Sequence, residues 1–309
     1  MELDVLCLGE AMVELNQLPS KAGEPPVYLQ GFGGDTSNVA IAAARQGARA
    51  GYLSAVGQDP FGELLLELWR REGVDTALVK RDPAAHTGVY FVTHGPAGHA
   101  FSYLRAGSAA SRLSPADVPA DLAGARWLHV SGISQAISAS ACDAVFAAAR
   151  QARAAGTRVS YDTNLRLKLW PLERARAVVH ATVPLCDVLL PSLEDAAALT
   201  GLEDPERILS FYLGLGAPLV VLKCGAAGAW VASAAERRRI PGRPVQAVDA
   251  TGAGDTFDGA FLAQLARGAD PFAAAAWANC AAALSTLGHG AVAPIPRRAE
   301  VEAALSQSP

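Results

Sequence analysis

Several sequence features that would assign this chain to a class are missing. Its five cysteines are scattered, and none forms a C-x-x-C pair or another spacing typical of a metal site. Neither the G-x-x-x-x-G-K-[ST] nor the G-x-G-x-x-G phosphate-binding sequence occurs. The sequence therefore disfavours disulfide-stapled, zinc-binding, P-loop and Rossmann proteins, and the cysteines are expected to be buried, reduced thiols.

An excess of basic charge and a long, strongly apolar run are also absent. The net charge is −4 and the pI about 5.9, and the short run at residues 236–239 is interpreted as a solvated turn. The longest apolar stretch, residues 272–288, is mainly alanine, which favours a buried helix over a membrane span. The first ten residues lack the pattern of a signal peptide. We expect a soluble, cytoplasmic protein without nucleic-acid or membrane partners.

Apolar residues are abundant, at 51% of 309, and they recur in alternating strand-like and helix-like segments. Strands are expected at 3–10, 48–57, 126–132, 157–164, 186–192, 218–225, 229–233 and 245–250. Helices are expected at 35–47, 59–73, 138–155, 171–181, 193–201 and 205–214, with two more after residue 252. This alternation predicts a single α/β domain over 1–309, a three-layer α/β/α sandwich with a mainly parallel central sheet.

One region departs from that alternation. Residues 87–107 carry β-branched and aromatic residues on both sides of a turn at 94–99, which predicts a β-hairpin. With the extended segment after residue 11, it predicts a small β-sheet lid formed from about 11–32 and 75–106.

Residues 249–261, DATGAGDTFDGAF, join an expected strand to an expected helix. Gly252 and Gly254 let backbone N–H groups converge at the helix N-terminus, which favours an anion. Asp255 is itself negative, so it suits a site where a base deprotonates a nucleophile that attacks phosphorus. The N–H groups would then stabilise the transferring phosphoryl group. The alternative is that Asp255 only caps the helix.

The same segment closely resembles the C-terminal signature of the ribokinase-like, or phosphofructokinase-B (PfkB), sugar kinases. Residues 33–47 and 51–62, GGDTSNVAIAAARQG and GYLSAVGQDPFG, resemble their N-terminal signature. The resemblance is in order and covers nearly the whole chain. It implies an ATP-dependent kinase that uses Mg²⁺, with Asp255 as catalytic base. The implied anion hole is the backbone of Thr251, Gly252, Ala253 and Gly254.

Further contacts follow from this resemblance. The implied sugar-binding turn comprises Gly33, Gly34, Asp35 and Asn38. The implied nucleotide-binding residues are Lys223, Gly225, Gly228, Thr251, Gly252, Gly254 and Asn279. Alternatives remain for the polar members: helix capping for Asp35 and Asn38, pairing with a surface carboxylate for Lys223, and a satisfied buried amide for Asn279.

The chain departs from the family at the metal-organising element. Many members carry N-x-x-E, which helps to organise magnesium through water, but the matching segment PSLEDAA has Ser192 in place of the asparagine. Glu194 and Asp195 both follow, and either is a candidate. Some relatives are activated by potassium, and residues 286–292 are a candidate neighbour of such a site.

Two arginines suggest the substrate class. Arg105 and Tyr103 lie two apart, on one face of a strand, and Arg166 follows an expected core strand. A guanidinium matches a carboxylate through two hydrogen bonds, which favours a sugar acid. The alternative is that each arginine pairs with a neighbouring Asp or Glu.

Residues 101–115 and 162–170 are also similar to 2-keto-3-deoxygluconate kinases. This implies substrate contacts from Gly34, Tyr90, Tyr103, Arg105 and Arg166, and conversion of 2-dehydro-3-deoxy-D-gluconate to its 6-phosphate. A kinase of a neutral sugar such as fructose or ribose is the second hypothesis, and a non-catalytic sugar-binding protein is the third. The lid is apolar on both faces, so one face is expected to cover the sugar and the other to form at least a homodimer.

Overall fold

The computed structural model describes residues 2–19, 25–95 and 98–307, and two β-sheets organise them. The larger sheet runs in the order β13 (Arg237–Ile240), β12 (Ala229–Ser233), β11 (Leu219–Lys223), β10 (Val188–Leu189), β9 (Arg158–Asp162), β8 (Ala125–Ser131), β1 (Leu3–Leu8), β4 (Ala50–Gly57) and β5 (Asp75–Asp82). From β5 to β11 neighbouring strands are parallel, and β12 and β13 add antiparallel pairs at one edge.

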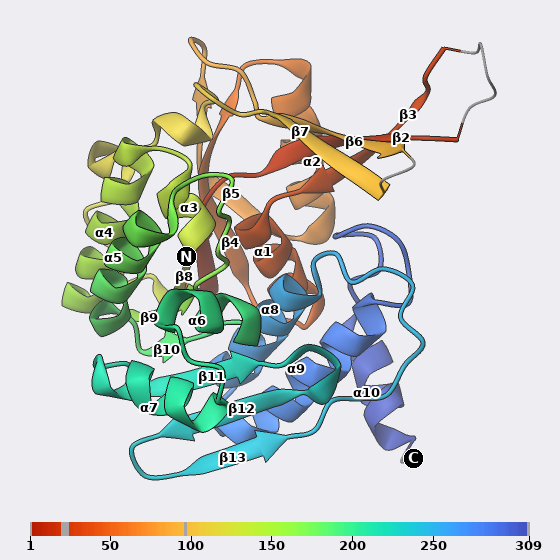
Figure 1. Cartoon of the computed structure of the whole chain (residues 1–309). Coiled ribbons are helices and arrows are strands. Elements are labelled where there is room, and N and C mark those ends of the chain that lie inside the picture. The colour runs from red at the N-terminus through yellow and green to blue at the C-terminus, as the bar shows by residue number, and fades with distance from the viewer. Residues whose placement is uncertain (1, 20–24, 96–97, 308–309) are drawn as a thin grey trace.

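Helices cover both faces of this sheet, as Figure 1 shows. One face packs on α1 (Asp35–Arg45), α2 (Pro60–Glu72), α8 (Ala253–Ala266), α9 (Pro271–Ser285) and α10 (Arg298–Ser306). The other packs on α3 (Gly132–Ala136), α4 (Ala139–Ala154), α5 (Leu172–Thr182), α6 (Leu193–Thr200) and α7 (Pro205–Gly214). Short 3₁₀ turns are η1 (Ala110–Arg112), η2 (Pro115–Asp117), η3 (Val183–Leu185) and η4 (Gly225–Ala227). The predicted three-layer sandwich is confirmed.

The smaller sheet projects from the body at the upper right of Figure 1. Its order is β3 (Tyr28–Gly33), β2 (Met12–Gln17), β6 (Val89–Gly95) and β7 (Gly98–Leu104). Val13 and Val89, paired across β2 and β6, are buried in the main core, whereas Leu29 and Leu104 are exposed. We call these four strands the lid.

Three secondary-structure predictions are wrong. Residues 75–82, expected in the lid, form β5 and pair with β4 in the larger sheet. Residues 245–250, expected as a strand, have no regular structure, and the arginine-rich segment expected as a turn forms β13 instead. Both β5 and β13 are edge strands, where exposed charged side chains are tolerated and the apolar alternation is therefore weak.

Local sequence signals correctly predict the ends of α2 but not the cap of α1. Asp59 caps α2 by accepting a hydrogen bond from the Gly62 N–H at 2.8 Å, and Gly73 ends it with φ 74°. By contrast, α1 has Gly34 at its N-cap and no side-chain cap. Capping by Asp35 is therefore wrong, because its carboxylate bonds to Ser131 and Asn164 on other segments.

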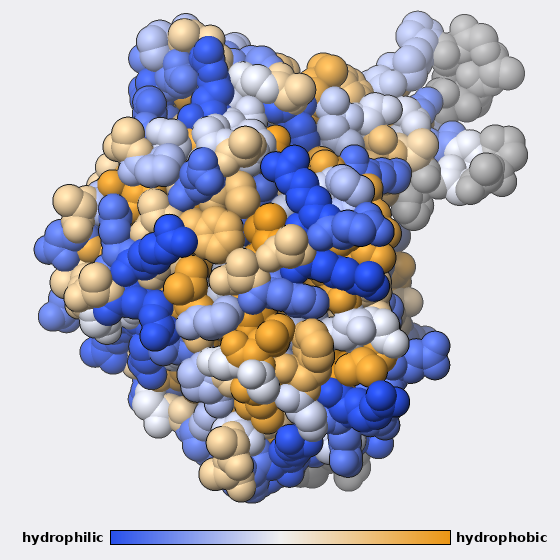
Figure 2. All heavy atoms as spheres, turned by 60° about the vertical axis from the view of Figure 1, so that its left-hand side comes forward, coloured by the Kyte–Doolittle hydropathy of each residue, from blue (hydrophilic) through white to orange (hydrophobic). Residues whose placement is uncertain are grey.

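The surface and the cysteines match the composition. Figure 2 shows apolar groups in small patches among hydrophilic ones on the side where Figure 1 places α4 and α5. Within the described ranges, no helix is long and apolar enough to cross a bilayer. All five cysteines are free thiols, and only Cys224 is partly exposed.

Candidate active site

Four segments far apart in the sequence meet at the carboxyl ends of the parallel strands. The N-terminus of α1 contacts that of α8 through Asn38, whose Nδ2 donates to Asp255 Oδ2 at 2.8 Å. The end of β9 contacts α1 through Asn164 Nδ2, which lies 3.3 Å from Asp35 Oδ2. The end of β11 contacts both β9 and α8 through Lys223. Open parallel sheets bind ligands at this edge, so these residues form the candidate site.

The loop before α8 is shaped by Gly252 and Asp249. Gly252 has φ 75°, and a Cβ there would lie 2.9 Å from the carbonyl oxygen of Ala291. Asp249 accepts hydrogen bonds from the Thr251 N–H and from the Gly290 N–H, each at 2.9 Å. The backbone of residues 252–254 is thereby held at the start of α8, where amide groups without helical partners can receive an anion.

Asp255 lies half-buried in the first turn of α8, and its ionisation differs from that of an ordinary carboxyl. Burial, and then repulsion from Asp35, raise its pKa to about 7, while the hydrogen bond from Asn38 opposes that shift. A carboxylate with a pKa near neutrality is a suitable general base at physiological pH.

Asp35 and Asn38 each present a buried oxygen without a hydrogen-bond partner. Asp35 Oδ2 accepts from the Ser131 hydroxyl, but Asp35 Oδ1 and Asn38 Oδ1 are unpaired among the described residues. Burial also raises the pKa of Asp35. Unpaired acceptors in a polar pocket are suited to ligand hydroxyl groups, because an unmet buried acceptor costs about 1–3 kcal/mol.

Lys223 pairs with two buried carboxylates. Its Nζ lies 2.9 Å from Asp258 and 3.1 Å from Asp162, so its partners are not the surface carboxylate considered as an alternative. The ammonium lowers the pKa of Asp162 and opposes the increase that burial causes for Asp258. A Cβ built on Gly254 would lie 3.7 Å from Nζ, so the ammonium is also beside the α8 loop.

The lid contributes Tyr90, Tyr103 and Arg105 at one side of the site. Tyr90 donates from its hydroxyl to Glu14, and a Cβ at Gly33 would collide with that hydroxyl. The rings of Tyr90 and Tyr103 stack at 5.7 Å, and Tyr103 remains 44% exposed.

Arg105 is paired with Glu10, which is only 1% exposed. The guanidinium Nε donates to Glu10 Oε2 at 2.8 Å, and the Ser108 hydroxyl donates to the other carboxylate oxygen. The alternative that an arginine pairs with a neighbouring carboxylate therefore holds for Arg105. It does not hold for Arg166, which is exposed and has no ion-pair partner within the described part of the chain.

The two candidate metal-organising carboxylates differ in position. Asp195 accepts from the Leu165 N–H at 3.0 Å and from the Thr163 hydroxyl at 3.3 Å, so it faces the loop after β9. Glu194 is exposed. Over residues 2–19, 25–95 and 98–307, no three His, Cys, Asp or Glu side chains gather as a preformed metal site.

A cavity of about 560 Å³ extends from the α8 loop between η4 and α9. Its lining includes Lys223, Gly225, Gly228, Gly254, Phe257 and Asn279. Asn279 donates to the carbonyl groups of Ile240 and Pro241, which satisfies its amide nitrogen as well as placing it in the wall. The volume is in the range of cofactor sites, and the cavity reaches the residue next to Asp255.

Sequence reasoning did not assign roles to Glu10, Asp162 or Asp258. Asp162 lies in the segment 162–170 and Asp258 in the segment 249–261, which were both compared with kinase sequences above. Asp258 follows Asp255 by three positions, on the same side of the helix. Glu10 directly follows the glycine at the end of a buried strand, which was the available signal.

Comparison with known proteins identifies the family of this chain. The family model described as pfkB family carbohydrate kinase matches residues 2–298. A 2-dehydro-3-deoxygluconokinase of Thermoproteus tenax is 36% identical, with 96% of this chain and 93% of that protein covered. A fructokinase of Vibrio alginolyticus is 34% identical, with coverages of 95% and 96%. The structure of a putative ribokinase II from E. coli in complex with ATP and Mg²⁺ superposes with a TM-score of 0.90 at 29% identity, covering 100% of both chains. The chain therefore belongs to the pfkB family of carbohydrate kinases.

Proposed function

We propose that this sugar kinase transfers the γ-phosphoryl group of ATP to a sugar acid, 2-dehydro-3-deoxy-D-gluconate, and releases the 6-phosphate and ADP. The observation that carries the acid assignment is Arg166. Its guanidinium is exposed and forms no ion pair among the described residues, although Nη1 donates to the Leu165 carbonyl oxygen at 2.9 Å. Arg166 lies two residues after Asn164, which contacts Asp35. A neutral sugar has no group that requires this charge, whereas a carboxylate would accept two hydrogen bonds from it.

Arg105 has a different part in this proposal. Its charge is balanced by Glu10, so it would orient the substrate through hydrogen bonds and add little net attraction for an acid. Tyr90, Tyr103, Gly33 and Gly34 would complete the sugar-binding surface under the lid. The unpaired oxygens of Asp35 and Asn38 would accept hydrogen bonds from sugar hydroxyl groups.

The reaction needs a base and a site for negative charge. Asp255 would take the proton from the attacking hydroxyl as its oxygen bonds to the γ-phosphorus and the bond to the β-phosphate oxygen breaks. The amides of Gly252, Ala253 and Gly254 would hold the transferring group, with each donor contributing about 3 kcal/mol in the transition state. Thr251 would support the same loop through Asp249.

Nucleotide and ions would occupy the adjoining cavity. ATP would lie along Lys223, Gly225, Gly228 and Asn279. Mg²⁺ would supply positive charge to the phosphate oxygens, and Asp195 is the better placed of the two candidate carboxylates to hold its water ligands. The proposal includes a potassium site beside residues 286–292, where the Gly290 N–H donates to Asp249.

Exposed apolar residues of the lid support a proposed homodimer. Leu29, on the face that carries Tyr90 and Tyr103, and Leu104, on the opposite face, are each 60% exposed. Apolar surface of this kind is usually covered by a second subunit. A light-scattering mass equal to one chain at micromolar concentration would reject the dimer. The free, buried thiols fit a cytoplasmic location.

The test is ADP release measured over matched sugar acids and neutral sugars, with 2-dehydro-3-deoxy-D-gluconate, fructose and ribose in the panel. We expect the acid to have the highest kcat/KM. In Arg166→Ala the kcat/KM for the acid should fall at least about tenfold, the loss expected for a charge-assisted hydrogen bond. The kcat/KM values for neutral sugars should stay within about twofold of those of the unmodified enzyme. Equal kcat/KM for the acid and for fructose in the unmodified enzyme would favour the second function, that of a fructokinase. This function has support from the 34% identical relative.

A further inference from the structure

A second cavity, of about 400 Å³, lies at the amino ends of the parallel strands, whereas the candidate active site lies at their carboxyl ends. Arg158, Val188 and Leu219 line it and are the first residues of β9, β10 and β11, whereas Asp162 and Lys223 of the candidate site end β9 and β11. Leu265 and Gly268, at the C-terminal end of α8, line its far side. This cavity is therefore separate from the one proposed for ATP.

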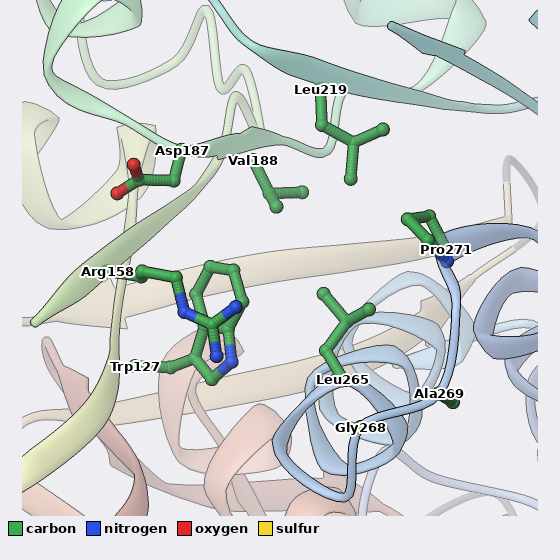
Figure 3. A pocket seen from close by; sticks show the side chains of 9 residues that line it. All are labelled: Trp127, Arg158, Asp187, Val188, Leu219, Leu265, Gly268, Ala269 and Pro271. Atoms are coloured by element: carbon green, nitrogen blue, oxygen red, sulfur yellow. The ribbon is translucent and has the colours of Figure 1, made fainter. Parts of the chain in front are cut away.

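One wall carries a cation that forms no ion pair with the described residues. Arg158 pairs with Trp127 across β8 and β9, and its guanidinium carbon lies 4.1 Å from the centre of the indole ring. No carboxylate within the described ranges forms an ion pair with Arg158. Asp187 also lines the cavity, but its Oδ2 accepts from the Val159 N–H at 2.7 Å, and Figure 3 shows its carboxylate turned away from Leu219. The guanidinium stacks on the ring through its flat face, so the N–H donors at its edge stay available for hydrogen bonds.

The same wall holds an unmet donor. The side chain of Trp127 is buried, at 2% exposure, and its Nε1 has no hydrogen-bond partner among the described residues. Figure 3 shows the nitrogen edge of the ring on the side of Leu265. A buried donor left unpaired costs about 1–3 kcal/mol, so an acceptor placed here by a ligand would be stabilised.

The opposite wall is apolar. Leu219 and Leu265 point toward one another in Figure 3, and Val188 and Pro271 lie beside them. A cavity with a cation and a neutral N–H donor on one side and aliphatic side chains on the other matches an amphipathic anion.

We propose that this cavity is a binding site for a small carboxylate with an apolar tail. The carboxylate would accept hydrogen bonds from the edge of the Arg158 guanidinium and from Trp127 Nε1, and the tail would pack between Leu219 and Leu265. The volume is within the range of about 300–1,000 Å³ of small-molecule sites. The proposal does not depend on the identity of the phosphorylated sugar.

The probe is hexanoate, and the readout is the indole N–H signal of Trp127 in the ¹⁵N-labelled full-length enzyme. The chain has five tryptophans, and Trp127→Phe identifies the relevant signal by its loss. We expect hexanoate to shift that signal saturably to lower field, as a new hydrogen bond requires, with hexylamine and hexanol causing no such shift. No shift at about 10 mM hexanoate, which would reveal even millimolar affinity, overturns the proposal.

Two further measurements separate this cavity from other sites. Arg158→Gln should weaken hexanoate binding at least about tenfold, the loss expected for a charge-assisted hydrogen bond. Arg153→Gln removes a nearby arginine that does not line the cavity and should leave the affinity within about twofold. Displacement of hexanoate by ATP or by the sugar acid, or equal binding of hexanol, would contradict the assignment.

Discussion

Asn38 and Asp255, 217 residues apart in the sequence, are joined by a hydrogen bond of 2.8 Å between the first turns of α1 and α8. The helix that presents the proposed sugar-binding turn therefore also positions the proposed base. Because Asn38 Nδ2 is used in this bond, its free Oδ1 is left to face a ligand. Placement of the acceptor hydroxyl and placement of the base thus depend on one side chain.

Replacement of the proposed base should separate chemistry from binding. In Asp255→Asn we expect kcat to fall by about 10²–10⁴-fold, the usual contribution of a general base, because the amide cannot accept the proton. The Kd for the sugar, measured by calorimetry without ATP, should change by no more than a few-fold. A variant that retained full kcat would show that another group accepts the proton.

The pH profile should report the raised pKa of Asp255. The base acts when deprotonated, so kcat/KM should rise with pH and level off above about 7. The hydrogen bond from Asn38 lowers this pKa, so Asn38→Leu should move the acidic limb to higher pH, whatever it does to the KM for sugar. In Asn279→Leu, which alters the cavity wall, the limb should stay in place. A limb that moves to lower pH in Asn38→Leu would contradict the assignment.

Gly252 can be tested against a glycine with the same backbone conformation. Gly73 has φ 74° and a Cβ there would meet no atom within 4 Å, so Gly73→Ala should cost only the left-handed backbone strain, about 1–2 kcal/mol. Gly252→Ala adds a contact of 2.9 Å with the Ala291 carbonyl oxygen. Urea unfolding should show a greater loss of stability for Gly252→Ala, and kcat should fall only in that variant. Equal losses would mean that the α8 loop adjusts freely.

Breaking the Glu10–Arg105 pair should cost far more stability than breaking a surface pair. Glu10→Gln leaves a nearly buried guanidinium without its countercharge, which typically costs about 3–5 kcal/mol. Glu67→Gln removes the partner of Arg70 on the exposed face of α2 and should cost no more than about 1 kcal/mol. The comparison is made by urea unfolding at neutral pH. Similar values for the two variants would show that water reaches Glu10 in solution.

The parts of this protein that local sequence predicts are those decided by neighbouring residues. The start and end of α2 follow from Asp59, Pro60 and Gly73, and the turn into α8, the proposed anion-binding loop, follows from Gly252 and Gly254. In each case the determining groups lie within a few positions of one another, so the sequence carries the whole signal.

The parts that the sequence did not predict depend on distant partners. The ion pair of Arg105 with Glu10 spans 95 positions, and the pairing of Lys223 with Asp162 and Asp258 joins three separate elements. The sheet to which β5 belongs is decided by its contact with β4, since its own side chains are largely exposed. Such choices are made by tertiary packing, which overrides local pattern.

The Glu10–Arg105 pair also has a consequence for how the lid can open. Glu10 lies between β1 and β2, and Arg105 directly follows β7, so the pair joins the chain that enters the lid at β2 to the chain that leaves it at β7. Because this pair holds the base of the lid, we do not expect the lid to rotate as a rigid body. Substrate is then expected to enter when the strand ends farthest from Glu10 bend, while the base of the lid stays in place.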